Sequence, residues 1–136
     1  MRWFWLPLTG LLAVAGLVTR RALFVVRIDG VSMQPTYRPG DAVLAIRSPI
    51  GPPIRHGDVV VCRLPAEVLG PTGLLVKRVA GLAGDTMDGA GVVPPGRVFV
   101  LGDGANSYDS RRFGPLPLSA VRGRVIARLS LPSDRR

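Results

Sequence analysis

The sequence predicts a mainly β fold that follows one N-terminal transmembrane helix. The 136-residue chain begins with an uncharged apolar stretch, and the rest consists of short apolar runs separated by turn residues. The whole chain holds 13 Pro and 17 Gly. Short apolar runs bounded by Pro and Gly are typical of strands joined by turns. Roughly a hundred residues remain after the apolar stretch, which is enough for one compact domain but not for two.

The apolar stretch is expected to be a membrane anchor over residues 1–21. No charged residue occurs from Trp3 to Thr19. A helix of that length spans roughly 26 Å at about 1.5 Å per residue, slightly short of a hydrocarbon core of about 30 Å. Two alternatives stay open. Ala13-Val14-Ala15 has the small-x-small form of a signal-peptide cleavage site, and the stretch could instead be a buried core helix.

Residues 22–130 are expected to form the β-rich domain, and residues 131–136 a frayed C-terminal tail. A short helical turn is expected at Met33 to Tyr37. The predicted strands are Leu23 to Ile28, Ala42 to Arg47, Asp58 to Leu64, Leu74 to Val79, Arg97 to Leu101 and Gly123 to Leu129.

The basic composition excludes some functions. Lys and Arg total 18 against nine acidic residues, for a net charge of +9. Aromatic residues make up only 6% of the chain and there is no run of five basic residues, so nucleic-acid binding is not expected. Membrane lipid is the expected partner for the charge. Cys62 is the only cysteine and His56 the only histidine, so a disulfide and a metal cluster are not expected, nor is a cofactor. Cys62 is predicted to be buried and His56 to lie in a solvated turn.

Lys77 is the only lysine among the 18 basic residues, and it lies in the apolar run Leu74 to Val79. Burial there would lower the pKa of its amine, whereas an arginine cannot give up its proton. Lys77 is therefore a candidate general base. The alternative is an ordinary strand residue whose ammonium group reaches water.

Two further segments could contribute to a site. Gly30 to Thr36 places Ser32 between a predicted strand end and a Pro-directed turn, where a hydroxyl can be exposed; most serines in such turns are only turn formers. Gly102 to Pro115 is rich in small polar residues. It could be a hydrophilic loop, or it could offer serine hydroxyls to Lys77 and brace itself with an Asp109/Arg111 pair.

Taken in order, these segments resemble the motif series of type I signal peptidases, and most closely its compact bacterial and mitochondrial inner-membrane members. The resemblance covers nearly all of residues 28–128 and is far more specific than any single motif. It rests on Ser32-Met33 with Pro35-Thr36, Gly57-Asp58-Val59-Val60, Lys77-Arg78-Val79-Ala80-Gly81 with Gly84-Asp85, Pro94-Pro95-Gly96, Gly102-Asp103, and Ser107-Tyr108-Asp109-Ser110-Arg111.

The resemblance implies a signal-peptidase-type β-rich catalytic fold with a Ser/Lys dyad. Ser32 would be the nucleophile and Lys77 the base, with the Ser32 amide as oxyanion donor. Ser107 would orient Lys77, and Asp109 and Arg111 would form a supporting ion pair. Three residues, Ile28, Met33 and Val76, would line shallow pockets for small side chains, and the substrate would bind as an added strand.

Two departures from the family pattern matter. Some members carry a serine as a second oxyanion donor where this chain has Gly30, which leaves that role to backbone or water. The interval from Asp103 to Ser107 is one residue shorter than usual, so the sequence leaves the contact of Asp103 open.

The resemblance implies an enzyme that removes N-terminal signal peptides from exported preproteins. It would be a monomeric, single-pass protein of a bacterial plasma membrane with an extracytoplasmic catalytic domain. Arg20 and Arg21 conflict with that topology, because the positive-inside rule alone would keep the domain cytoplasmic. The alternatives are a maturation peptidase with one client, such as a nickel superoxide dismutase precursor, a self-cleaving repressor of the SOS type, and a non-catalytic β domain at the membrane surface.

Overall fold

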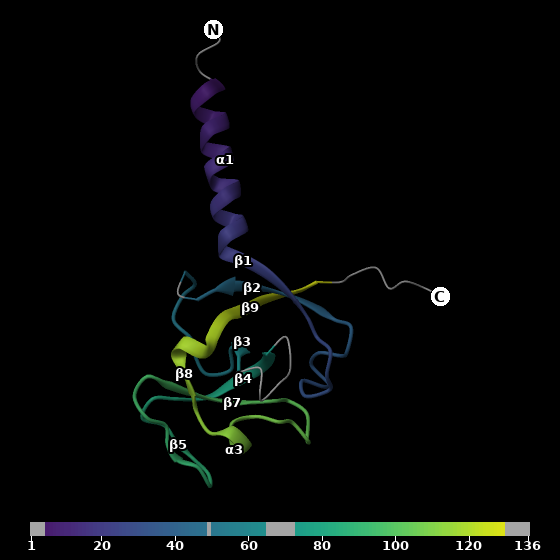
Figure 1. Ribbon diagram of the computed structural model, residues 1–136, viewed down its shortest axis with the longest axis vertical. Helices are drawn as coiled ribbons and strands as arrows, with labels where there is room; N and C mark the ends of the chain where they lie inside the picture. Colours follow the sequence, from purple (N-terminus) through teal and green to yellow (C-terminus); the bar gives the residue numbers. More distant parts are fainter. Residues whose placement is uncertain (1–4, 49, 65–72, 130–136) are drawn as a thin grey trace, which may run out of the picture.

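The computed structural model describes residues 5–48, 50–64 and 73–129, and its N-terminal element is a single helix that stands apart from the β-rich part (Figure 1). Helix α1 (Trp5–Ala22) has basic residues in its last turn, Arg20 and Arg21, where they complement the helix dipole. Most of its described apolar side chains are exposed, with Leu11 at 66% and Leu12 at 64%, whereas Ala22 at its end is buried. Within the described residues, no helix combines the length and the apolar character that crossing a membrane requires.

The prediction of a mainly β fold is confirmed. Seven strands form one antiparallel sheet in the order β1-β2-β9-β3-β4-β7-β8, and a small β5-β6 hairpin stands beside it. A four-residue helix, α3 (Ser110–Phe113), and a 3-10 turn (Leu118–Ala120) complete the described elements. The strands are β1 (Leu23–Arg27), β2 (Ala42–Arg47), β3 (Val59–Arg63), β4 (Leu74–Leu82), β5 (Thr86–Met87), β6 (Gly91–Val92), β7 (Arg97–Leu101), β8 (Leu116–Pro117) and β9 (Val121–Leu129).

The strand predictions differ from the structure mainly at β4. Strand β4 continues three residues beyond the predicted end at Val79, and its pairing with β7 shifts register between Val79 and Gly81. A bulge of this kind lets a strand keep its partner while it bends. A Cβ at Gly81 would come within 2.5 Å of Met87 Sδ, so a larger residue there would have to displace the Met87 side chain. The short β5, β6 and β8 were not predicted, because two residues cannot show an alternating pattern.

Strand β3 lies at the centre of the core and is buried on both faces. Val59 and Val61 belong to one apolar cluster, and Val60 and Cys62 belong to the other. Cys62 is fully buried, as predicted, and burial raises the pKa of its thiol to about 12. Such a thiol stays protonated and unreactive. The two clusters therefore hold the strands that carry the candidate site.

The sheet curls, so that strands distant in its order approach each other. Residues of β1 and β4 line the same groove, although β2, β9 and β3 lie between them in the sheet. Among the described strands, β1 pairs only with β2, and Leu74 to Lys77 pair only with β3, because β7 begins to pair at Arg78. Each side of the groove thus offers a strand edge with open backbone positions.

Candidate active site

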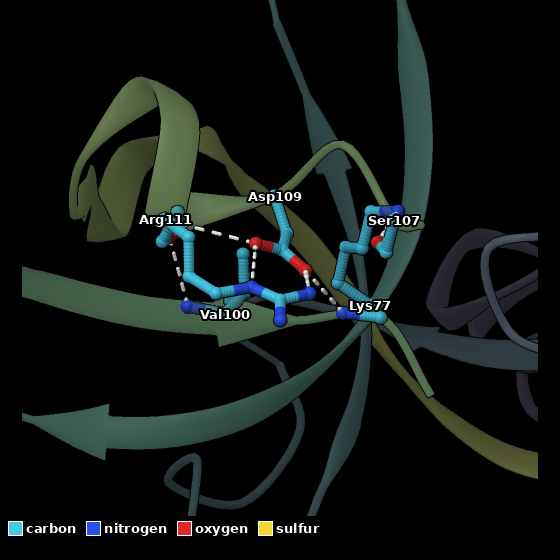
Figure 2. A network of polar contacts seen from close by, with 7 residues as sticks. Lys77, Val100, Ser107, Asp109 and Arg111 are labelled. Atoms are coloured by element: carbon cyan, nitrogen blue, oxygen red, sulfur yellow. Dashed lines mark hydrogen bonds and ion pairs between the residues drawn. The ribbon is translucent and has the colours of Figure 1, made fainter. Parts of the chain in front are cut away.

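Lys77 lies on β4 opposite Val60, with its side chain in the interior. It is 1% exposed, and its Nζ donates a 2.9 Å hydrogen bond to Ser107 Oγ (Figure 2). Burial lowers the pKa of the Lys77 amine, and this effect outweighs Asp109 and Cys62, which favour the charged form. The amine therefore holds its proton less tightly than an ordinary lysine.

The loop after β7 is built around the buried carboxylate of Asp109. Its Oδ2 accepts hydrogen bonds from Arg111 Nη2 at 2.7 Å and from the Gly102 N–H at 3.0 Å. Its Oδ1 accepts from Arg111 Nε at 2.9 Å and from the Arg111 N–H at 3.1 Å, which caps α3 (Figure 2). Burial alone would raise the pKa of Asp109, but the hydrogen bonds from Arg111 and Gly102, with a smaller contribution from Ser107, hold the pKa well below its usual range.

The same loop is joined to β7 by Ser110. Its buried Oγ accepts a 2.9 Å hydrogen bond from the Val100 N–H (Figure 2). The carboxylate of Asp109 and the hydroxyl of Ser110 thus fix both ends of the segment that presents Ser107 to Lys77.

Ser32 lies in the turn after β1, and its backbone is bound to the same loop. Its carbonyl oxygen accepts a 2.8 Å hydrogen bond from the Gly104 N–H. A Cβ on Gly102 would fall 2.0 Å from Ser107 Oγ and 2.5 Å from Ser32 O, so both serines lie against the side of Gly102 that a side chain would occupy. Ser32 Oγ is half-buried and makes no hydrogen bond with any residue that the structure describes.

Gly30 has open space around it. A Cβ built on it would meet no heavy atom within 4 Å, and its φ is not in the left-handed region. Neither crowding nor backbone conformation requires a glycine here.

Asp103, whose contact the sequence left open, joins the turn that holds Ser32 to the strand that holds Lys77. Its carboxylate accepts from Arg78 Nε at 2.9 Å and Nη2 at 2.8 Å, and from Thr36 Oγ1 at 2.6 Å. Hydrogen bonding to Arg78 is the main reason that the pKa of Asp103 is lowered. Arg78 follows Lys77 in the chain, and Thr36 ends the turn of Ser32. The bidentate pair of Arg78 with Asp103, together with the hydrogen bond from Thr36, therefore couples the segments of the two candidate residues.

Arg128 also holds this turn, a contact that was not predicted from the sequence. Its Nη2 donates to the Thr36 carbonyl and, at 2.9 Å, to Asp41 Oδ2, and its guanidinium lies 5.0 Å from the centroid of the Tyr37 ring. No local pattern could have identified it, because it is 92 residues from Thr36 and is one of 17 arginines.

The groove between β1 and β4 has a volume of about 340 Å³ and reaches Ser32. Ile28, Met33 and Val76 all line it and are buried. Small apolar side chains fit such a surface.

His56 lies in an exposed turn, where its Nε2 is 2.5 Å from Asp85 Oδ2. Among the contacts of the described residues, none links His56 to Ser32 or Lys77. Among the described residues, the arrangement therefore offers the Lys77 amine, whose pKa is lowered, and the Ser32 hydroxyl as groups for nucleophilic chemistry.

Comparisons with known proteins all find similarity to one family of peptidases. The model of the signal peptidase family, peptidase S26, matches residues 1–91 and 86–130. The chain is 36% identical to mitochondrial inner membrane protease subunit 1 of Mus musculus, over 81% of this chain and 71% of the relative. It is 40% identical to mitochondrial ATP-independent inner membrane protease subunit 1b of Arabidopsis thaliana, over 78% and 69%. It is also 34% identical to subunit 2 of the inner membrane protease of Danio rerio, over 79% and 64%.

Proposed function

Because the chain belongs to the signal peptidase family, peptidase S26, and is therefore a hydrolase, we propose that it cleaves leader peptides from exported preproteins with a Ser32/Lys77 dyad. The observation that carries the proposal is the state of Lys77. It is the only lysine of the chain, it is buried to 1% exposure, its pKa is lowered by that burial, and a hydroxyl holds its amine.

The reaction is acyl transfer. Neutral Lys77 takes the proton of Ser32 Oγ as this oxygen attacks the scissile carbonyl. Lys77 then gives the proton to the leaving amine, so that the mature protein departs and the leader stays bound to Ser32 as an ester. A water molecule that loses its proton to Lys77 hydrolyses the ester, which releases the leader and regenerates Ser32.

The transition-state oxyanion needs donors that are already in place. The Ser32 N–H is the donor we assign, since the Ser32 carbonyl is fixed by Gly104 and the turn is held by Thr36 and Asp103. Gly30 contributes no side-chain donor. Ser107, Asp109 and Arg111 are positioning residues, because they act through Lys77 and its loop.

The substrate binds as a strand between the open edges of β1 and of Leu74 to Val76. Its small side chains enter the apolar surface formed by Ile28, Met33 and Val76. Backbone hydrogen bonds to both edges account for binding, and the shallow pockets restrict the size of the residues before the scissile bond.

We assign α1 the role of a single membrane anchor, with the catalytic part at the outer face of a bacterial plasma membrane. The exposed apolar side chains of α1 support this role, and the relatives named above are inner membrane proteases. Full-length protein should sediment with lipid vesicles. A Leu11→Asp/Leu12→Asp variant should stay in the supernatant, and equal sedimentation of both would contradict the anchor.

The dyad is tested with full-length protein in detergent micelles and a leader-bearing substrate. Ser32→Ala and Lys77→Arg should each abolish cleavage, the latter because a guanidinium keeps its proton at any usable pH. His56→Ala is the control and should cleave at the wild-type rate. Wild-type cleavage by either dyad variant would refute the mechanism. The products formed from the host's own exported proteins would separate a general leader peptidase from one with a single client.

A further inference from the structure

One wall of the groove carries an unpaired carboxylate. Five of the described aspartates are paired with basic side chains, namely Asp41 with Arg128, Asp58 with Arg124, Asp85 with His56, Asp103 with Arg78, and Asp109 with Arg111. In the part of the chain that the structure describes, Asp29 and Asp88 have no such partner. Asp29 lines the groove, three residues before Ser32, whereas Asp88 lies in the β5-β6 turn.

The chain from Val26 to Asp29 alternates in burial. Val26 and Ile28 are buried, and Arg27 and Asp29 are exposed, although all four line the groove. The extended pairing continues past the end of β1, because the Ile28 N–H donates to the Asp41 carbonyl at 2.7 Å. This wall of the groove therefore has an apolar inner side and a charged outer side.

A peptide added beside this wall alternates in the same way. The residue whose carbonyl meets Ser32 directs its side chain inward, toward Ile28 and Met33. The second residue before the scissile bond then points outward, and so does the fourth. Asp29 is nearer to Ser32 along the wall, and Arg27 is two residues further away.

We propose that Asp29 is a specificity-determining residue that favours lysine or arginine at the second residue before the scissile bond. Arg27 favours an acidic residue at the fourth in the same way. The inference rests on the proposed function, since it takes Ser32 as the site of cleavage and the groove as the seat of the leader. The chain has a net charge of +9, yet the carboxylate of Asp29 in the groove has no ion-pair partner among the described residues. It is therefore free to pair with a cationic side chain of the substrate.

The test uses full-length enzyme and three leader peptides that differ only in lysine, glutamine or glutamate at the second residue before the scissile bond. Wild-type kcat/KM should fall in that order, by about two- to fivefold per step, the range of an exposed ion pair. Added salt should reduce the differences in kcat/KM among the three peptides. Each enzyme is normalised to its own rate on the glutamine peptide.

Asp29→Asn should remove the ranking and Asp29→Lys should reverse it, while Asp88→Asn, the matched control, should keep it. An unchanged ranking in Asp29→Asn would overturn the inference, and so would equal cleavage of the three peptides by the wild type. Those outcomes leave the proposed function intact. If no peptide is cleaved and a leader-bearing preprotein is not cleaved either, the proposed function fails and the inference fails with it.

Discussion

Lys77 Nζ donates its hydrogen bond to Ser107 Oγ at 2.9 Å, across 30 residues of sequence and in a buried environment. The contact fixes the direction of the amine, and the loop that supplies the hydroxyl is itself held by Asp109 and Ser110. The lysine is thus oriented by a neutral group, while the carboxylate of Asp109, which favours the charged amine, is engaged by Arg111.

Ser107→Ala should lower kcat about 10- to 100-fold, because removal of one partner of a buried hydrogen bond costs about 1–3 kcal/mol and leaves the amine misdirected. Steady-state kinetics on a leader substrate measure the effect. Ser107→Thr keeps a hydroxyl and should recover part of the rate. Ser119→Ala, at an exposed serine in the 3-10 turn, is the control. An unchanged kcat in Ser107→Ala would remove Ser107 from the mechanism.

Lys77→Met should make the protein more stable at pH 7. The pKa of Lys77 is lowered in the folded state, so between that pKa and the ordinary value of 10.5 the unfolded chain binds a proton that the folded chain does not. This difference destabilises the wild type and vanishes as the pH rises to about 10.5. Denaturant unfolding of both proteins from pH 6 to 11 should therefore give a gap that closes with rising pH. A gap independent of pH would show that Lys77 is charged in the fold.

Asp109→Asn should destabilise the fold by about 2 kcal/mol at pH 7, because an amide cannot accept all the hydrogen bonds that the carboxylate receives. The pKa of Asp109 is held below its ordinary value of 3.8, so its stabilisation is complete above that value and is lost as the pH falls toward the folded-state pKa. The gap between variant and wild type in chemical denaturation should accordingly narrow below about pH 4. Asp88→Asn, at an exposed carboxylate, should show no gap at any pH.

Gly30→Ser should fold as the wild type does and raise kcat a few-fold. The space around Gly30 accepts a side chain, and a hydroxyl two residues before Ser32 would add a donor for the oxyanion of the proposed reaction. Steady-state kinetics measure the change in kcat, and thermal unfolding measures whether the variant is as stable as the wild type. Gly30→Ala tests the space without the donor and should match the wild type in both. A serine variant no faster than the alanine variant would mean that the hydroxyl does not reach the oxyanion.

Much of the fold follows from local pattern. Ala42 to Arg47 and Arg97 to Leu101 are strands within the predicted bounds, because apolar runs between turns leave the backbone few alternatives. Strand β4 exceeded its prediction, because the bulge near Gly81 depends on a partner strand that no local window contains. The ordered motifs also sufficed to place the chain in its family, which the family model and the relatives confirm.

Local sequence patterns are enough to predict the mainly β class, the family, and the candidate pair of a serine in a turn and a lone lysine in an apolar run. Other features emerge only in the folded chain: Asp103 joins Arg78 to Thr36, Arg128 reaches the turn across 92 residues, and β1 and β4 face each other over a groove. The difference lies in the range of the interactions. Alternation and turn chemistry act over a few residues, whereas these contacts depend on the register and curl of the whole sheet.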